Sequence, residues 1–397
     1  MIKVGVIFGG ESVEHEVSII TAVQAMNYID RGKYEVVPIY IAKNRSWYTG
    51  DALLDMSTYK NLELVPSLTR EVTLTRKENR FILQAKTGLF KGSIDTIDVA
   101  FPIVHGKGVE DGSLSGYLDT LGIPYVGPSM LGASIGQDKV VQKQVMAACG
   151  IPVVDFTWFY DNDYIEDNKK ILEDIKKIGY PVIVKPARLG SSVGISVAKS
   201  EKEIDEAITE AIKYDEKICV EAMVPNLLEV DCAVVGNYKE MECSLIGEML
   251  TDNDFLTFED KYLAGGKGSK GGAKSGGKIV NSGFKIPAEL DKKIEEDIYK
   301  YAKEAFRCLN LSGVTRFDFL VDRNSKQVYV NEPNTIPGCL AFFFYTPKGK
   351  KYNKLLDEMI TTAIREYKEG KKKVTSFESN VLSTFDGSKG AKGKMQN

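Results

Sequence analysis

The residues whose types and spacing could do chemistry lie together late in the chain, in RFDFLVDRNSKQVYVNEPNTIPG, residues 316–338. Apolar and polar residues alternate there as in two β-strands joined by a turn. Side chains two apart in a strand point to the same side, so Arg316 and Asp318 share a face of the first arm. By the same rule, Glu332 and Asn334 share a face of the second arm. The segment therefore predicts a hairpin that gathers an arginine, two carboxylates and an amide.

This set of side chains suits a magnesium site. Carboxylate and amide oxygens are hard ligands, which favour Mg²⁺ held together with substrate phosphates over zinc or copper. The alternative is a surface hairpin with solvated charges. Pro333, Thr335 and Pro337 make that alternative weaker, because they are a poor continuation for an ordinary strand. The segment thus indicates nucleotide-phosphate chemistry.

A second candidate site is the glycine-rich segment VIVKPARLGSSVG. A buried strand at 182–184 would deliver Lys185, and the run from Gly190 to Gly194 offers backbone N–H groups and two hydroxyls. Such a loop can close over phosphates while the lysine supplies a point charge. A plain hairpin turn with a solvent-reaching lysine is the alternative, because the segment matches neither a Walker A motif nor a dinucleotide fingerprint.

The chain has only two histidines, His15 and His105, and each follows a predicted strand within a glycine-flanked polar motif. Loops after the carboxyl ends of parallel strands are where α/β sheets place ligands. Either histidine could instead cap a helix or bind a backbone carbonyl. A di-histidine metal site is disfavoured, because the hairpin supplies a better oxygen set.

The elements that must position these residues follow an α/β pattern. Strands at 2–8, 34–42 and 97–104 and a helix at 17–29 predict a doubly wound parallel sheet at the N-terminus. The stretch 43–96 has weak patterning and fits a small sheet insertion. Residues 151–224 alternate strands and helices as in a small α+β unit, with one helix expected at 164–178.

We predict three domains and a tail. The domains are an N-terminal α/β domain at 1–127, a central subdomain at 128–224 and a C-terminal subdomain at 225–369 that holds the hairpin. The glycine-lysine stretch 265–278 predicts a mobile loop, and 370–397 predicts a disordered tail.

The composition fits a soluble enzyme and excludes little else. The 52 basic and 55 acidic residues nearly cancel, so no global field invites nucleic acid or a membrane surface. The six cysteines form no C-x-x-C pair, which favours free thiols in a reducing compartment. No stretch approaches the ~20 apolar residues of a spanning helix, and the N-terminus has no secretory pattern. We expect a cytoplasmic protein with no nucleic-acid or membrane partner.

Seven motifs in order over residues 1–369 carry a family resemblance: FGGESVEHEVS, HGKGVEDG, PYVGP with DK, KPARLGSSVG, EDKY, RFDF and NEPNTIPG. Together they resemble the D-alanine–D-alanine ligase family of ATP-grasp enzymes. The resemblance implies a three-domain ATP-grasp fold and a homodimer. It also implies phosphorylation of a D-alanine carboxylate by ATP, followed by attack of a second amino acid's amine on the acyl phosphate.

The resemblance also implies roles on the nucleotide side of the site. Asp318, Glu332 and Asn334 would carry two Mg²⁺ ions, and Mn²⁺ would suit the same ligands. The remaining positions would hold ATP: Lys139 and Lys185 the phosphates, Glu221, Met223 and Val224 the adenine edge, and Glu229 the ribose.

On the amino-acid side, the resemblance implies a second set of roles. Glu14 would bind the first ammonium, with Ser191 and Tyr262 linked to it, and His105 would lie beside that subsite. Arg316 and the backbone N–H of Gly338 would hold the developing oxyanion. Lys261 would serve the acyl phosphate and the acceptor carboxylate, and 265–278 would be a long closing loop.

One departure concerns the acceptor. Relatives usually carry a serine after the NTxPG motif, whereas this chain has Phe342, Phe343 and Phe344 there. A site without that hydroxyl loses discrimination for the acceptor carboxylate, unless the phenylalanines are core residues and the alignment slips. Retention of Tyr262 argues against a hydroxy-acid acceptor.

Three functions follow from this reading. The leading one is D-alanyl-D-alanine synthesis for peptidoglycan. The alternatives are a sister ligase with another acceptor, such as D-serine or a more apolar amine, and a nucleotide-binding sensor without turnover.

Overall fold

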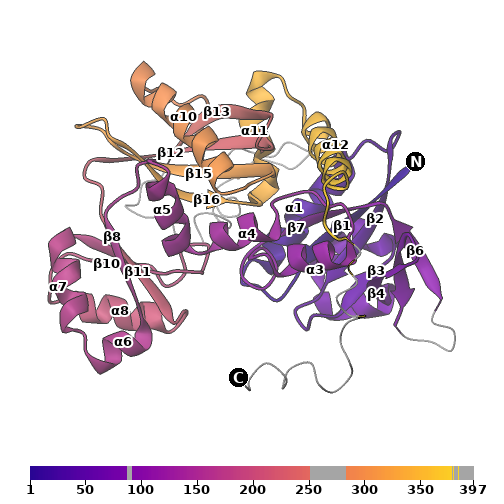
Figure 1. Cartoon of the computed structure of the whole chain (residues 1–397), viewed down its shortest axis with the longest axis horizontal. Helices are drawn as coiled ribbons and strands as arrows, with labels where there is room; N and C mark the ends of the chain where they lie inside the picture. Colours follow the sequence, from indigo (N-terminus) through magenta and orange to yellow (C-terminus); the bar gives the residue numbers. More distant parts are fainter. Residues whose placement is uncertain (87–91, 251–282, 378, 380–382, 384–397) are drawn as a thin grey trace.

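The computed structural model describes residues 1–86, 92–250, 283–377, 379 and 383. Three β-sheets organise these residues, and helices cover them (Figure 1). Among the described residues, none of the helices has both the length and the apolar character that a bilayer crossing requires.

The N-terminal sheet is mixed. Its seven strands run in the order β6 (Ser93–Ile97), β5 (Arg80–Ala85), β4 (Arg70–Lys77), β3 (Trp47–Thr49), β2 (Tyr34–Ile41), β1 (Ile2–Gly9) and β7 (Val99–Val104). β1 pairs in parallel with β2 and β7, and the other neighbours pair antiparallel. The parallel strands are long apolar runs, as expected for strands covered on both faces. The weakly patterned stretch 43–96 supplies the antiparallel half, so the predicted sheet insertion is confirmed.

Helices and short turns complete the N-terminal unit. They are α1 (His15–Tyr28), η1 (Asp51–Leu54), η2 (Met56–Lys60), η3 (Leu62–Leu64), α2 (Val65–Leu68) and α3 (Ser113–Leu121). Helix α1 begins two residues before the sequence pattern predicted, because the polar residues His15 and Glu16 ahead of its apolar stretch are already helical.

The central sheet has the order β10 (Ser196–Ala198), β9 (Val182–Pro186), β11 (Lys217–Ala222) and β8 (Phe156–Tyr160), and all its pairs are antiparallel. Its helices are α6 (Asp161–Glu166), α7 (Lys169–Ile178) and α8 (Ile204–Ile212). The single helix expected at 164–178 is therefore wrong. Asp167 is extended, and its carboxylate accepts a hydrogen bond from the backbone N–H of Lys169 at 3.2 Å, which starts a new helix.

The C-terminal sheet has the order β14 (Phe284–Lys285), β13 (Met241–Met249), β12 (Leu227–Gly236), β15 (Gly313–Asp322) and β16 (Val328–Asn334). Helix α10 (Lys292–Cys308) packs on it through buried residues such as Ile298 and Phe306. The chain ends in η5 (Gly338–Ala341), α11 (Phe342–Tyr345), η6 (Thr346–Lys348) and α12 (Tyr352–Gly370).

Three helices link the units. α4 (Met130–Gln137) and α5 (Lys139–Ala148) connect the N-terminal and central units (Figure 1). Met146 of α5 packs in the core of the C-terminal sheet. Helix α12 returns to the N-terminal unit, where Leu355, Leu356 and Met359 join the core that contains β1 and β7. The proposed domain boundaries at 127 and 224 stay a prediction.

Candidate active site

The β15–β16 hairpin presents its polar residues on one face. Arg316 lies opposite Asn334 and Asp318 lies opposite Glu332, as the strand alternation predicts. The alternate residue Phe317 is fully buried on the other face, which directs the charged side chains away from the core. A β-bulge follows Asp318, so the pairing shifts at the point where the carboxylates meet.

Asp318 is the centre of this face. Its carboxylate accepts two hydrogen bonds from Arg316, at 2.8 and 2.9 Å, and one from the side-chain amide of Asn334 at 3.0 Å. Among the described residues, no group of three or more histidines, cysteines, aspartates and glutamates gathers as a metal site. The candidate set is therefore two carboxylates and an amide, which leaves coordination positions for phosphate oxygens and water, as Mg²⁺ prefers.

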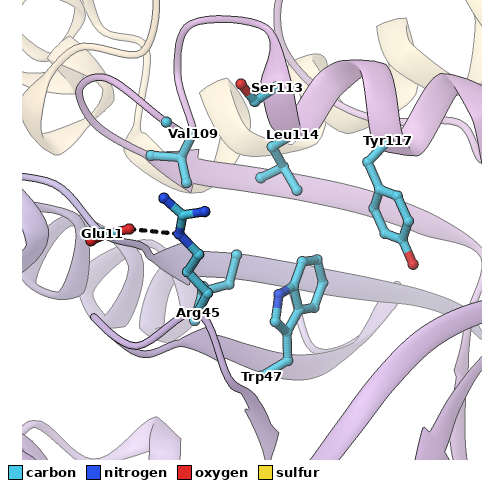
Figure 2. Close-up of a pocket in the computed structure, with 9 residues that line it drawn as sticks. Glu11, Arg45, Trp47, Val109, Ser113, Leu114 and Tyr117 are labelled. Carbon is cyan, nitrogen blue, oxygen red and sulfur yellow. Dashed lines mark hydrogen bonds and ion pairs between the residues drawn. The ribbon is translucent and has the colours of Figure 1, made fainter.

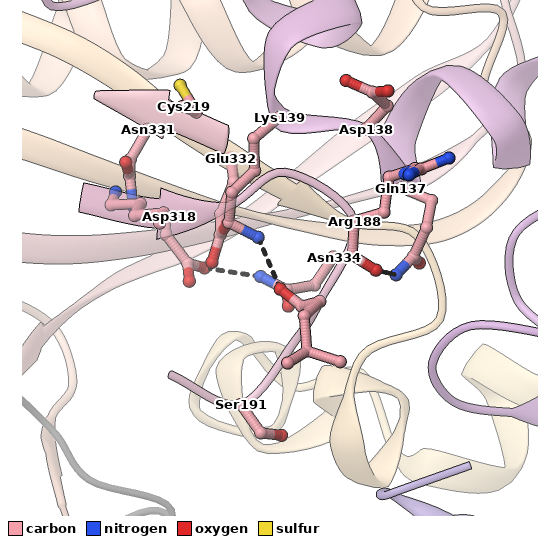
Figure 3. Close-up of polar contacts among 12 residues, drawn as sticks. Gln137, Asp138, Lys139, Arg188, Ser191, Cys219, Asp318, Asn331, Glu332 and Asn334 are labelled. Atoms are coloured by element: carbon pink, nitrogen blue, oxygen red, sulfur yellow. Dashed lines mark hydrogen bonds and ion pairs between the residues drawn. The ribbon is translucent and has the colours of Figure 1, made fainter. Parts of the chain in front are cut away.

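Lys139 reaches this face from the start of α5. The carboxylate of Asp138 caps the helix by accepting hydrogen bonds from two backbone N–H groups at 3.0 Å. The Nζ of Lys139 lies 3.1 Å from Oε2 of Glu332 and donates to the carbonyl of Leu189 at 2.9 Å (Figure 3). The structure thus brings Lys139 and Glu332 together although they lie far apart in the sequence.

Lys185, Glu221 and Lys143 form a buried charge cluster behind the hairpin. Oε2 of Glu221 lies 2.7 Å from Lys185, and Oε1 lies 3.3 Å from Lys143. Burial opposes ionisation of Glu221, but the two lysines lower its pKa to about 2. Burial also opposes the charge of Lys185, yet Glu221 and Glu332 raise its pKa above the ordinary value. Both groups are therefore charged, and Lys185 can attract phosphate.

The glycine-rich loop after β9 carries Ser191 to the N-terminal unit. Ser191 and Ser192 have φ of 55° and 58°, in the left-handed region that side chains rarely adopt. In this conformation the hydroxyl of Ser191 donates a hydrogen bond to the carboxylate of Glu14, just before α1. A Cβ on Gly190 would lie 2.9 Å from that carboxylate, so the loop approaches Glu14 closely.

His105 and Glu110 complete the amino-acid side of the site, on the loop after β7. Burial lowers the pKa of His105, although Glu14 opposes this, so the imidazole is neutral at pH 7. Its Nε2 is buried and has no hydrogen-bond partner in the described part of the chain. Burial and the neighbouring Glu14 raise the pKa of Glu110 to about 7.

Glu110 also binds the segment that leads to Gly338. Its Oε1 accepts hydrogen bonds from the hydroxyl of Thr335 at 2.9 Å and the backbone N–H of Ile336 at 3.0 Å. Beyond Gly338, Cys339 donates its backbone N–H to the hydroxyl of Thr21 in α1 at 3.1 Å. The loop that follows the hairpin is therefore fixed to the N-terminal unit at two points.

The residues expected around adenine and ribose lie where the central and C-terminal sheets meet. Val224 follows β11 and packs in a small cluster with Val154 and Leu320. Met223 is the residue before it, and its backbone N–H donates to the carbonyl of Pro181 at 3.3 Å. Glu229 lies on β12 opposite Leu320 of β15.

Two predicted residues, Lys261 and Tyr262, lie outside the described residues, and so do the stretch 265–278 and most of the tail after 377. Their predicted roles are carried only by the sequence.

The three phenylalanines are packing residues. Phe344 is fully buried and lies against Phe284, with ring centroids 5.2 Å apart. The ring of Phe342 stacks on Tyr352 of α12 with ring centroids 4.4 Å apart. The ring centroids of Phe343 and Phe284 are 5.8 Å apart. This packing supports the interpretation that they are core residues.

Sequence reasoning missed three residues of the site. Lys143 lies one helical turn after Lys139, a spacing that could have revealed it. Glu110 lies in the HGKGVEDG motif, where only the histidine was singled out. Asp231 lies two residues after Glu229 on β12, on the same face, and is almost fully buried at 1% exposure. The sequence alone does not show that Asp231 is buried or which residues contact it, so its importance could not be recognised.

A separate pocket of about 370 Å³ lies beside the loops that carry Glu14 and His105. Trp47 and Tyr117 form an edge-to-face pair on one side, and Arg45 pairs with Glu11 at 2.6 Å on the other (Figure 2). None of the predicted site residues that the structure describes lines it.

The chain matches two family models that together cover most of its length. The model described as "D-ala D-ala ligase N-terminus" matches residues 3–128, and "D-ala D-ala ligase C-terminus" matches residues 145–361. The D-alanine–D-alanine ligase of Thermosipho melanesiensis is 39% identical over 96% of this chain and 98% of its own. The enzyme of the same name from Clostridium acetobutylicum is 36% identical over 91% of this chain and 97% of its own.

Solved structures show the same similarity. The D-alanine–D-alanine ligase of Coxiella burnetii superposes with a TM-score of 0.77 at 29% identity, covering 94% of this chain and 96% of that one. The VanG D-Ala:D-Ser ligase of Enterococcus faecalis gives a TM-score of 0.74 at 27% identity, covering 91% of this chain and 99% of that one.

Proposed function

The chain belongs to the D-alanine–D-alanine ligase family and is an ADP-forming carbon–nitrogen ligase, and we propose that it joins two D-alanines for peptidoglycan. The observation that carries the proposal is the Ser191–Glu14 hydrogen bond, with buried His105 beside it. This contact supports the proposal because the Glu14 carboxylate, which would bind the donor ammonium, lies beside the glycine-rich loop that follows the strand carrying Lys185.

We assign the nucleotide side from the family resemblance, and the charges near the hairpin support the assignment of the phosphates. Lys139 and Lys185 hold the ATP phosphates, because both ammonium groups lie next to the carboxylate face of the hairpin. Glu221, Met223 and Val224 take the adenine edge, and Glu229 takes the ribose.

Asp318, Glu332 and Asn334 fit Mg²⁺, since their oxygens are hard ligands on one face of the hairpin. Bound there, Mg²⁺ would neutralise charge on the transferring phosphate. The family resemblance implies two such ions.

The amino-acid side positions the reacting groups. Glu14 binds the ammonium of the donor, which brings its carboxylate toward the γ-phosphate. Phosphorylation gives an acyl phosphate, and the second amine attacks its carbonyl carbon with loss of inorganic phosphate. Arg316 and the backbone N–H of Gly338 stabilise the oxyanion that develops in this step. Neutral His105 lies beside the donor subsite. It can form a hydrogen bond there without competing, as a cation would, with the donor ammonium for the carboxylate of Glu14.

The predicted closing segment completes the site. Lys261 would bind the acyl phosphate and the acceptor carboxylate, and Tyr262 would join the Ser191–Glu14 pair. Closure of 265–278 would exclude water and so protect the acyl phosphate from hydrolysis.

The second candidate is D-alanyl-D-serine synthesis. The likeness to the VanG D-Ala:D-Ser ligase favours it. The core packing of the phenylalanines favours the first candidate instead.

We further propose a cytoplasmic homodimer. All six cysteines are free, which suits a reducing compartment where ATP is available.

Mass spectrometry of the products and ADP release test the function together. The purified protein is given ATP, Mg²⁺ and D-alanine, alone or paired with D-serine or other amines. ADP release with D-alanine alone and a D-alanyl-D-alanine product is the expected result. Release only with a paired acceptor would establish a sister ligase. No release with any pair would overturn both candidates and favour the sensor.

A further inference from the structure

Arg316 lies between two carboxylates on neighbouring strands. Its Nε and Nη2 donate to the two oxygens of Asp318 at 2.8 and 2.9 Å. The same Nε lies 3.0 Å from Oδ2 of Asp231 on β12, which is directly opposite Asp318 in the strand register. The guanidinium thus has an ion pair on each side.

Asp231 is the more deeply buried of the two carboxylates. Its side chain is 1% exposed, against 16% for Asp318 and 17% for Arg316. An ionised carboxylate removed this far from water needs a positive partner, and the described structure places Arg316 there. Asp231 therefore favours a position of Arg316 close to itself, although Asp231 has no role in the reaction as proposed.

The contacts of Asp318 conflict with the roles assigned to it and to Arg316. Both carboxylate oxygens are engaged by the guanidinium fork, so a metal ion must compete for the same lone pairs. Arg316 also needs free N–H groups to bind an oxyanion. Both roles require the Arg316–Asp318 fork to open.

We propose that Asp231 is a positioning residue that holds Arg316 when Asp318 takes up the metal ion, an inference that rests on the proposed function. The Nε of Arg316 stays with Asp231, and its Nη groups turn from Asp318 toward the reacting carbonyl. The exchange needs no large movement, because Asp231 already lies within ion-pair distance of Nε. Asp231 would thereby release Asp318 from Arg316, so that Asp318 can bind the metal ion and Arg316 can stabilise the oxyanion of the transition state.

Direct attraction is the competing explanation. A carboxylate near a metal site raises metal affinity through its charge, whatever Arg316 does. The two explanations differ in coupling. Positioning makes the effect of Asp231 depend on Arg316, whereas direct attraction is at least as strong without the arginine, because Arg316 no longer neutralises Asp231.

A double-mutant cycle on metal affinity separates them. Mn²⁺ binding is measured by electron paramagnetic resonance, with a non-hydrolysable ATP analogue present, in the full-length wild type, Asp231→Asn, Arg316→Gln and the double variant. We expect Asp231→Asn to weaken Mn²⁺ binding about tenfold in the wild-type background. In the Arg316→Gln background, we expect the loss in Mn²⁺ affinity to be smaller by a factor of at least ~5. An equal or larger loss in the Arg316→Gln background, or no loss in the wild type, would overturn the proposal.

Asp357→Asn is the matched control. This partly buried carboxylate pairs with Lys33 and with the hydroxyl of Tyr34, both at 2.7 Å and both in the N-terminal unit, so its loss should leave Mn²⁺ affinity unchanged. Circular dichroism and thermal unfolding verify that each variant is folded. If Asp231→Asn does not fold, Asp231→Glu takes its place in the cycle.

The dipeptide assay keeps the two proposals apart. Coupling in the Mn²⁺ cycle without any dipeptide product from the wild type would refute the function and leave the role of Asp231 intact. Dipeptide product without coupling would refute only the role of Asp231.

Discussion

The hairpin and the N-terminal loops build their halves of the site by different means. In the hairpin, one strand register sets Arg316, Asp318, Glu332 and Asn334 on one face. The other half joins Glu14, His105 and Ser191 from three separate segments, through loops with left-handed backbone. A register is local and rigid, whereas the loop cluster depends on how two units pack. Substitutions in the hairpin should therefore impair the chemical step, whereas substitutions in the loops should alter the conformation of the site.

Asp318→Asn gives the largest expected effect. The change keeps the shape and removes the charge of the proposed metal ligand, so we expect kcat to fall roughly 10²–10³-fold. Steady-state ADP release at increasing Mg²⁺ measures it. A kcat within twofold of the wild type would show that the hairpin is not the metal site.

Glu110→Gln tests the contact between the two halves. The pKa of Glu110 is about 7 in the folded protein against an ordinary 4.5, so the folded state keeps a proton that the unfolded chain releases. Stability contributed by this proton is complete below pH ~4.5 and lost as the pH rises to ~7, on the order of 3 kcal/mol. The variant should lack this slope.

Urea unfolding between pH 4.5 and 8 measures the effect of Glu110→Gln. The exposed Glu173→Gln on α7 serves as control and should keep the wild-type slope. A slope that persists in Glu110→Gln would assign it to another group.

Ser191→Ala weakens the loop cluster more mildly. It removes the hydrogen bond to Glu14, so we expect KM for the donor amino acid to rise about tenfold, from the loss of one hydrogen bond to a charged group. The expected change in kcat is smaller. Ser192→Ala, with the same left-handed backbone, should leave the donor KM unchanged, and an equal rise in both variants would point to loop conformation instead.

Lys326→Ala should have the smallest effect. Lys326 lies at the turn of the same hairpin and pairs with Asp291 at 2.6 Å, with both side chains 56% exposed. Exposed ion pairs contribute little, so we expect less than about 1 kcal/mol in unfolding free energy and an unchanged kcat. A large fall in kcat would mean that the hairpin is not rigid along its length.

Prediction from sequence succeeded where the chemistry is local. The hairpin and the lysine-bearing strand β9 follow from the alternation and the apolar run in the sequence. The break at Asp167 was missed because the extended backbone of this residue, with its side-chain hydrogen bond to Lys169, interrupts the helical period. Glu110, Lys143 and Asp231 were missed because their importance lies in partners from distant segments.

The sequence by itself determined the set of reactive groups, the face of the hairpin on which they lie, and the family. Strand alternation needs only neighbouring residues, and seven ordered motifs need no coordinates. Only the tertiary structure decided the charge states and pairings: Glu221 ionised between two lysines, Glu110 with a pKa of about 7, and Arg316 between Asp231 and Asp318. Burial and distance set the energy of a charge, and both arise only when the three sheets pack against each other.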